Sequence, residues 1–227
     1  MVAIKHFPIM NRFLAGVLGV MLMGLAGTAG AAELLATVRD QKAKPVSDAV
    51  VLAMPLDRKV FDLARPVRHV VDQVNKEFVP YVRVVFAGTS VSFPNKDNIR
   101  HHVYSFSPAK KFELALYSGV SAPPVLFDKA GVVVLGCNIH DWMIGYIYVA
   151  DTPFFGKTEK EGQASLENLP PGDYQVRLWH PDMEKDEQAT VQRVTVTDKT
   201  TNLAWTIALK PSFRIPRPTG ASSSGYR

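Results

Sequence analysis

Cysteine is scarce in this sequence: Cys137 is the only one among 227 residues. A single cysteine cannot form a disulfide within its own chain, and it excludes a binuclear copper centre that needs two thiolates. The usual catalytic motifs are also missing. There is no glycine-rich phosphate loop, no serine-nucleophile motif and no second histidine cluster for a catalytic copper. We therefore expect a protein that is not an enzyme.

Charge of one sign is present in only a small excess. Lys and Arg number 26 against 21 Asp and Glu, giving +5. Two of the basic residues, Lys5 and Arg12, lie in an N-terminal stretch without acids, so the rest of the chain keeps +3. Nucleic-acid-binding proteins carry larger, clustered basic excesses, so no nucleic-acid partner is expected. A hydrophobic content of 47% is typical of a globular protein.

One long apolar run, Phe13 to Ala26, follows Lys5 and Arg12 and precedes Ala29-Gly30-Ala31. A basic start, an apolar centre and an A-x-A site are the three parts of a secretory signal peptide, which we place at residues 1–31. A membrane anchor needs about 20 apolar residues, more than this run supplies. We expect an exported protein, periplasmic if the source is Gram-negative, with no membrane segment after cleavage.

In an exported protein, an unpaired thiol is an inert buried group, an intermolecular disulfide or a metal ligand. Cys137 begins the string CNIHDWM, which places His140 and Met143 at C-x2-H-x2-M spacing. Thiolate, imidazole and a weak thioether are the ligand types of a blue-copper site. Such a site needs a second imidazole, and His101 and His102 lie upstream. The pattern therefore predicts one copper ion that changes between Cu(I) and Cu(II).

With these motifs, residues 72–149 resemble a cupredoxin, the family of plastocyanin, pseudoazurin and amicyanin, and the short loop is most similar to that of amicyanin. The strings HHVYSFSPAKKFEL and GCNIHDWM also resemble exported bacterial proteins labelled methylamine utilization protein. The cupredoxin resemblance implies a copper ion held by His101, Cys137, His140 and Met143. It also implies single-electron transfer between redox protein partners, with His140 nearest the surface and an apolar rim for docking.

The sequence departs from the family at His102, because cupredoxins usually have asparagine directly after the first histidine. Residues 103–106 are predicted to be a strand, where adjacent side chains point to opposite faces. Only one of His101 and His102 can then readily enter the site. Family position implies that His101 is the ligand and that His102 braces the ligand loop by a hydrogen bond. His102 as the true ligand, or as an additional one, stays open.

Short apolar runs separated by glycine and proline predict strands. The runs are 81–86, 91–93, 103–106, 112–116, 125–127, 132–135 and 144–149. Their number and spacing fit a Greek-key β-sandwich, which we place at residues 67–150. No long helix is predicted, although Val60 to Lys76 has room for a short one.

A second β-sandwich is predicted around the first. Residues 162–179 resemble the late strands of transthyretin-like or carboxypeptidase regulatory-like domains, and residues 37–50 resemble the early ones. We therefore expect an all-β protein in which the cupredoxin sandwich is inserted into a split transthyretin-like, Ig-like sandwich made of residues 33–60 and 151–210. In the simpler alternative, the N-terminal strand belongs to the copper domain. Residues 211–227, rich in proline, serine and glycine, are expected to be a disordered tail.

Two other functions compete with electron transfer. A copper-binding or copper-delivery protein would hold and pass on the ion without redox turnover, and a structural β-protein would have a decayed site. Fast, reversible redox change with the metal retained favours the electron carrier. Easy loss of the metal to a chelator favours delivery.

Overall fold

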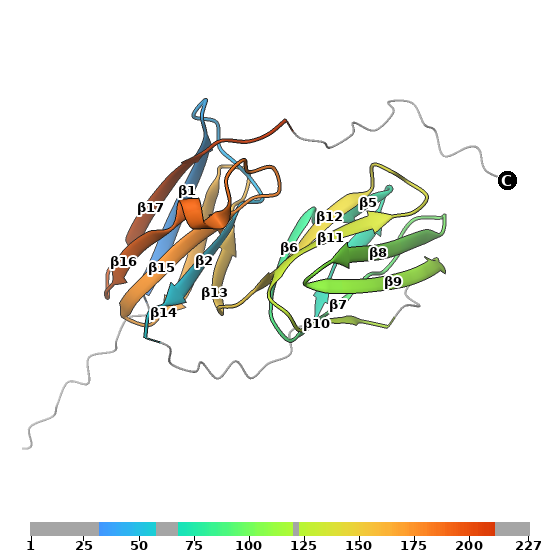
Figure 1. The fold of residues 1–227 in the computed structure, drawn as a ribbon, viewed down its shortest axis with the longest axis horizontal. Helices are drawn as coiled ribbons and strands as arrows, with labels where there is room; N and C mark the ends of the chain where they lie inside the picture. The colour runs from blue at the N-terminus through green and yellow to red at the C-terminus, as the bar shows by residue number, and fades with distance from the viewer. Residues whose placement is uncertain (1–31, 58–67, 120–122, 212–227) are drawn as a thin grey trace, which may run out of the picture.

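The computed structural model describes residues 32–57, 68–119 and 123–211 (Figure 1). The predicted signal peptide and all but the first residue of the predicted tail lie outside these ranges. The described residues form 17 strands and one short 3₁₀ turn, Glu187–Thr190, without an α-helix, so the all-β prediction is confirmed. Within the same ranges, no helix has the length and apolar character needed to cross a membrane.

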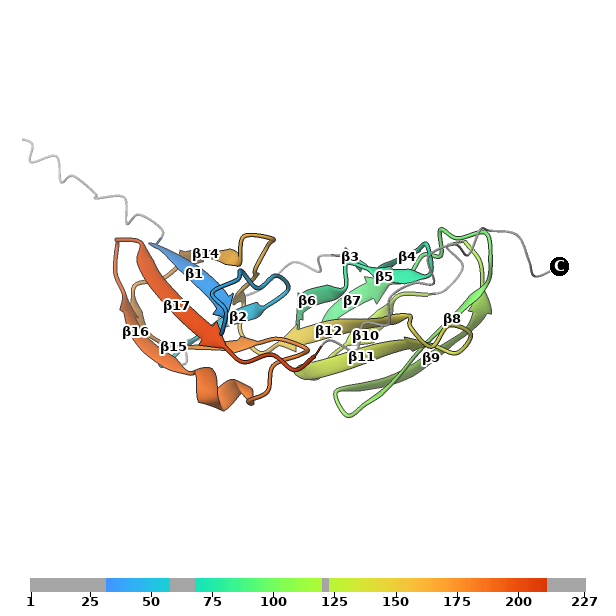
Figure 2. The same ribbon diagram turned by 90° about the horizontal axis from the view of Figure 1, so that it is seen from above.

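The strands gather into two lobes that lie end to end in both ribbon views (Figures 1 and 2). We call residues 68–150 the central lobe and the described residues on either side of them the flanking lobe. The strands of the central lobe are β3 (His69–Val70), β4 (Asp72–Val74), β5 (Glu77–Val79), β6 (Val82–Phe86), β7 (Thr89–Ser92), β8 (His101–Ser107), β9 (Lys110–Tyr117), β10 (Val125–Phe127), β11 (Gly131–Cys137) and β12 (Ile144–Ala150).

The central lobe is a sandwich of a five-stranded sheet, ordered β6-β12-β11-β8-β9, and a three-stranded sheet, ordered β10-β7-β3. The short hairpin β4-β5 adds Phe78, 2% exposed, to the core of this lobe. Buried and partly exposed residues alternate along β8, so one of its faces enters the core. That core includes Val103, Leu135 and Ile147, each fully buried. Cys137 belongs to the same cluster, which places the end of β11 at the edge of a packed interior.

The segment 69–79 corrects the suggestion of a short helix within Val60 to Lys76. Residues 58–67 lie outside the described part, and the rest forms β3, β4 and β5. Asn75 and Lys76, between β4 and β5, both have positive φ, 54° and 61°. Two such residues in succession are the signature of a type I′ hairpin turn, which a helix cannot contain.

The flanking lobe is also built from two sheets, ordered β14-β1-β17 and β13-β2-β15-β16. Its strands are β1 (Ala32–Asp40), β2 (Val50–Pro55), β13 (Phe154–Lys157), β14 (Gln163–Leu169), β15 (Gly172–Trp179), β16 (Gln192–Val196) and β17 (Thr201–Ile207). The first strand, β1, lies parallel to the last, β17, from Leu34 opposite Thr201 to Asp40 opposite Ile207. Residues of the first and the last described ranges therefore share one core, separate from that of the central lobe.

A third apolar cluster joins the two lobes. Fully buried Val50 and Leu52 of β2 pack in it with Val82 of β6 and Ala150 of β12. Trp179 lies against the rings of Tyr146 and Tyr148, with centroid separations of 5.8 and 5.4 Å. Because β12 begins in the central lobe and ends in this cluster, one strand connects the far end of the central lobe to the boundary.

Candidate metal centre

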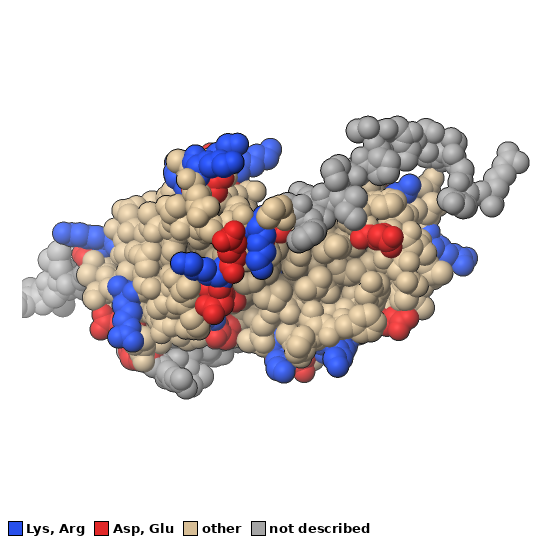
Figure 3. Space-filling model, turned by 45° about the horizontal axis from the view of Figure 1, so that its top comes forward, with Lys and Arg blue, Asp and Glu red and all other residues tan. Residues whose placement is uncertain are grey.

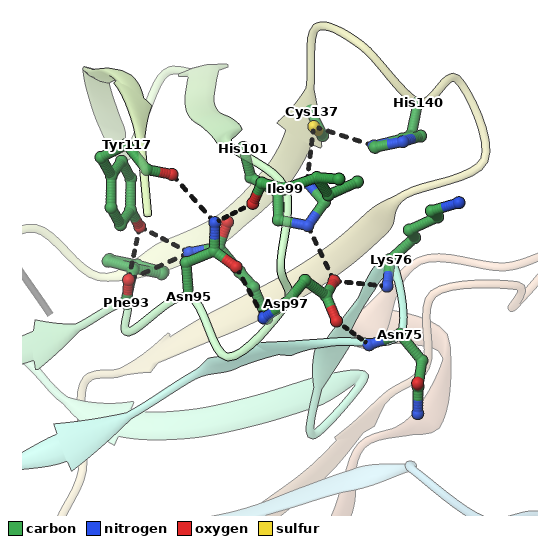
Figure 4. Close-up of polar contacts among 11 residues, drawn as sticks. Asn75, Lys76, Phe93, Asn95, Asp97, Ile99, His101, Tyr117, Cys137 and His140 are labelled. Atoms are coloured by element: carbon green, nitrogen blue, oxygen red, sulfur yellow. Dashed lines mark hydrogen bonds and ion pairs between the residues drawn. The ribbon is translucent and has the colours of Figure 1, made fainter. Parts of the chain in front are cut away.

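Three side chains converge at the end of the central lobe where β11 ends and β12 begins. His101 is the first residue of β8, Cys137 is the last of β11, and His140 lies in the loop that follows. β8 and β11 are paired, with Val103 opposite Cys137, which brings His101 beside the thiol. Figure 4 shows both imidazoles turned toward the sulfur.

The distances suit one shared metal ion. Nδ1 of His101 and Nδ1 of His140 each lie 3.7 Å from Sγ of Cys137, and the ligand atoms of the three residues lie within 4.8 Å of one another. Metal–sulfur and metal–nitrogen bonds of about 2.3 and 2.0 Å, as known for zinc, let a single ion span about 4.3 Å between two such atoms. The two-imidazole, one-thiolate donor set is that of a copper electron-transfer site.

Met143, the fourth predicted residue, lies in the same region. It is 1% exposed and belongs to the core cluster that contains Cys137. Its backbone N–H donates to the carbonyl of His140 over 2.9 Å, which closes a tight turn between the two residues. The structure thus keeps Met143 on the inner side of the loop that carries His140.

His102 points to the opposite face from His101, as the strand alternation predicts. Its Nε2 lies 2.9 Å from Oε1 of Glu113, and its ring lies against that of Tyr104. The expectation that the His102 side chain braces the ligand loop is therefore wrong. The backbone N–H of His102 contacts the sulfur of Cys137 instead. The pairing of β8 with β11 places this N–H toward the thiol, so the contact does not depend on residue 102 being a histidine.

A carboxylate stands behind His101. Nε2 of His101 lies 2.8 Å from Oδ2 of Asp97, so one ring nitrogen faces the thiol and the other faces an acid. Asp97 also accepts the backbone N–H groups of Asn75 and Lys76, at 2.5 and 2.8 Å. The turn between β4 and β5 therefore holds this carboxylate in place (Figure 4).

Buried polar groups support the loop before β8. Asn95, 4% exposed, donates from Nδ2 to the carbonyls of Ile99 and Tyr117, at 2.8 and 2.9 Å, and its Oδ1 accepts the N–H of Asp97 at 2.9 Å. Gln73, fully buried, donates to the carbonyl of Phe93 at 3.0 Å. These bonds fix residues 95–99 and, through them, the position of Asp97.

The electrostatics favour a thiolate at Cys137. Burial alone would raise the pKa of this thiol, but hydrogen bonds from His101 and from the backbone N–H groups of His102 and Ile139 lower it overall. For His101, burial would lower the pKa, but the contacts with Cys137 and Asp97 raise it. Burial, followed by repulsion from His101 and Lys76, lowers the pKa of His140. The lowered pKa values of Cys137 and His140 favour the deprotonated forms that bind metals, whereas the raised pKa of His101 favours its protonated form until a metal displaces the proton.

The outer side of the site is apolar. Trp142 lies against the ring of His140, with centroids 5.2 Å apart. Ile139 and Ile144, at the two ends of the same loop, are 48% and 36% exposed. In Figure 3, charged side chains are sparse over much of the visible face of the central lobe, at the right, and gather near the boundary between the lobes. His140 thus has exposed apolar side chains on its own loop, together with the exposed Asp141.

Comparison with known proteins finds likeness in structure alone. No protein-family model matches the chain, and no curated protein matches it. A purple cupredoxin from Nitrosopumilus maritimus is 20% identical, with a TM-score of 0.32, and the match covers 37% of this chain and 98% of that one. A reduced amicyanin variant is 20% identical, with a TM-score of 0.34 and coverages of 43% and 98%.

A copper-containing nitrite reductase from Thermus scotoductus is also similar. It is 24% identical, with a TM-score of 0.36, and the match covers 52% of this chain and 28% of the enzyme chain. All three TM-scores are below 0.5, so the likeness carries no argument about the site. The case for a metal rests on the ligand atoms themselves.

Sequence reasoning did not identify Asp97, Asn95 or Gln73 as parts of the site. Asp97 lies four residues before His101, yet in a loop this spacing does not fix whether two side chains meet. Gln73 is more than twenty residues from the nearest ligand. A search for acids shortly before the first histidine could have found Asp97, but no signal in the sequence marks Asn95 or Gln73.

Proposed function

We propose that this protein is an exported, mononuclear type 1 copper protein that carries single electrons between redox protein partners. His101, Cys137 and His140 would hold the ion, with Met143 as a weak axial ligand. A bound copper ion supplies the redox chemistry, taking one electron from a reduced partner and giving it to an oxidised one. The observation that carries the proposal is the convergence of both Nδ1 atoms at 3.7 Å from the same sulfur.

The protein's own residues favour fast electron transfer by holding the ligands still. His101 is fully buried and contacts Asp97, and Cys137 ends a strand that is paired on both sides. Ligands fixed in this way rearrange little when the charge of the metal changes, which lowers the barrier to electron transfer. This rigidity supports the carrier over a delivery protein, whose ligands must release the ion.

The surroundings of His140 suit a docking site for a redox partner. His140 is partly exposed, and Ile139 and Ile144 beside it present apolar surface. The site lies at the start of β12, whereas the flanking lobe contacts the end of that strand. The flanking lobe therefore leaves this end of the central lobe open to another protein. An apolar patch of this kind suits a brief encounter between redox proteins.

The visible and EPR spectra of the Cu(II)-loaded protein, beside a Cys137→Ser variant, test the proposal. We expect an intense sulfur-to-copper band and narrow copper hyperfine splitting in the wild type and neither feature in the variant. A weak, ordinary Cu(II) spectrum that the substitution leaves unchanged would rule out the electron carrier.

A chelator experiment separates the carrier from a copper-delivery protein. The loaded protein is reduced and reoxidised repeatedly in the presence of a Cu(I) chelator, and the copper that remains bound is counted. Retention through many cycles is expected of a carrier. Loss of the ion in the first reduction would favour delivery.

A further inference from the structure

The carboxylate of Asp97 contacts a ligand residue of the candidate centre, His101. It lies behind His101, 2.8 Å from Nε2, on the side of the ring away from the thiol. The side chain of His101 is fully buried, with 0% exposure. The contact is therefore screened little by solvent, unlike a surface ion pair.

Asp97 is also fixed in orientation. Its Oδ1 accepts the N–H of Asn75, and its Oδ2 accepts the N–H of Lys76 and lies 2.8 Å from Nε2 of His101. Its own N–H is bound by the side chain of Asn95. Two backbone N–H donors on one carboxylate favour its charged form, and both come from the hairpin turn of another element, β4-β5. The acid is held from two directions.

The chain contains a natural comparison in the next residue. His102 has its own carboxylate partner, Glu113, 2.9 Å away, but on the outer face of the sheet, and the side chain of Glu113 is 67% exposed. Asp97 is 12% exposed. Adjacent histidines therefore each face an acid, one buried beside the thiol and one at the surface. An electrostatic effect on the copper should therefore come from Asp97 and not from Glu113.

We propose that Asp97 is a positioning residue that presents Nδ1 of His101 to the metal and lowers the reduction potential of the bound copper. The inference rests on the proposed function. By accepting the Nε2 proton, the carboxylate fixes the ring tautomer that leaves the Nδ1 lone pair free, and it orients the ring. Its negative charge also makes the imidazole a stronger donor. Both effects stabilise Cu(II) more than Cu(I), because the ion of higher charge gains more from an electron-rich ligand.

The test compares Asp97→Asn with the matched control Glu113→Gln. Each substitution removes the charge of one acid beside one histidine and keeps its size. Affinities for Cu(II) and Cu(I) alone are measured by competition, and the reduction potential by redox titration. We expect Asp97→Asn to weaken Cu(II) binding by about 10- to 100-fold, the range known for such partners. Cu(I) binding should weaken less, so the potential rises by about 59 mV for each tenfold change in the affinity ratio.

Glu113→Gln should leave both affinities unchanged within twofold and should not shift the potential. Equal effects of the two substitutions, or none from Asp97→Asn, would overturn the role of Asp97. If wild-type protein shows no Cys137-dependent copper band, the proposed function fails, which is a different result from a normal band that Asp97→Asn does not alter.

A second measurement needs neither copper nor a variant. Nitrogen-15 NMR of the metal-free wild-type protein, at a pH where the ring is neutral, reports which nitrogen of His101 carries the proton. The proposal expects the proton on Nε2. A proton on Nδ1 would overturn it, even if Asp97→Asn does not fold.

Discussion

At the scale of single residues, the site depends on which face of a strand a side chain takes. His101 and His102 are chemically identical neighbours at the start of β8, yet His101 is fully buried beside the thiol and His102 pairs with Glu113 on the outer face. The strand's two-residue period predicts this separation from sequence. It does not predict which acid each histidine meets, because Asp97 and Glu113 are brought there by a loop and by a neighbouring strand.

This difference gives a paired prediction. His101→Gln should abolish the sulfur-to-copper band, because one of the two imidazoles beside Cys137 is lost. His102→Gln should keep the band, its wavelength and its intensity. Visible spectra of the two Cu(II)-loaded variants decide the matter. If the band is lost in His102→Gln and kept in His101→Gln, the ligand is His102 and not His101.

His180, in the flanking lobe, gives a prediction on pH and stability. It is 9% exposed, and burial lowers its pKa below the ordinary value of 6.5, while nearby Asp182 and Asp48 oppose the shift. The unfolded chain then binds a proton more readily than the folded one, so stability is lost as the pH falls through 6.5. The effect is limited to about 1.4 kcal/mol per pH unit.

Urea unfolding of the metal-free protein at pH 7.5 and 5.5 measures this loss. His69 and His140 shift in the same direction, so the comparison is with His180→Asn, which retains an acceptor for the N–H of Asp182. The variant should lose less stability on acidification than the wild type. An identical loss in both would show that His180 does not contribute.

At the scale of elements, the sequence predicts most strands to within one or two residues. The predicted run 125–127 matches β10, and the run 132–135 lies within β11. The run 144–149 covers all of β12 except its last residue. Alternating apolar residues bounded by glycine and proline carry this information. The turn at Asn75 and Lys76 was missed, because two residues of positive φ leave little trace in composition when neither is glycine.

Two glycines on neighbouring strands are predicted to respond differently to alanine. A Cβ at Gly145 of β12 would lie 2.8 Å from Cβ of Phe78, a residue 2% exposed that cannot move aside. A Cβ at Gly136 of β11 would lie 2.7 Å from Cζ of Tyr104, the far end of a partly exposed ring. Gly145→Ala should cost about 1–3 kcal/mol of unfolding free energy.

Gly136→Ala should cost less, because the ring of Tyr104 can swing outward. Thermal or urea unfolding of both variants gives the comparison, and Tyr104→Ala should restore the stability lost in Gly136→Ala. A larger cost at Gly136 than at Gly145 would mean that the ring of Tyr104 is held firmly.

At the scale of the whole molecule, polar contacts accompany the apolar cluster between the lobes. Arg177 of β15 pairs through Nε with Glu187 at 3.0 Å and through a terminal nitrogen with Asp151 at 2.5 Å. Tyr148 of the central lobe donates to the same Glu187 carboxylate at 2.7 Å. Arg177, Asp151 and Glu187 all lie in the flanking lobe, with Asp151 directly after β12, so Tyr148 is the residue of the central lobe in this polar group. We propose that the lobes are separate domains that this contact holds together.

Arg177→Met should lower the unfolding free energy by about 1–3 kcal/mol, because it leaves the partly buried Glu187 without its cation. Arg193→Met, at an exposed position of the neighbouring β16, is the control and should have little effect. Urea unfolding followed by tryptophan fluorescence measures both. The copper spectrum should be the same in both variants, because the metal site lies at the other end of β12. Equal stabilities would show that Arg177 does not stabilise the polar group that Tyr148 joins through Glu187.

The parallel pairing of β1 with β17 also means that the flanking lobe is completed last during synthesis. Residues 68–150 are complete before β14, β15 and β17 have left the ribosome, so the metal pocket can close while β1 and β2 still lack their sheet partners. A chain that stops before residue 201 would leave Leu34 and its neighbours without the strand beside them. Premature termination would therefore damage the first strand of the protein as well as its last.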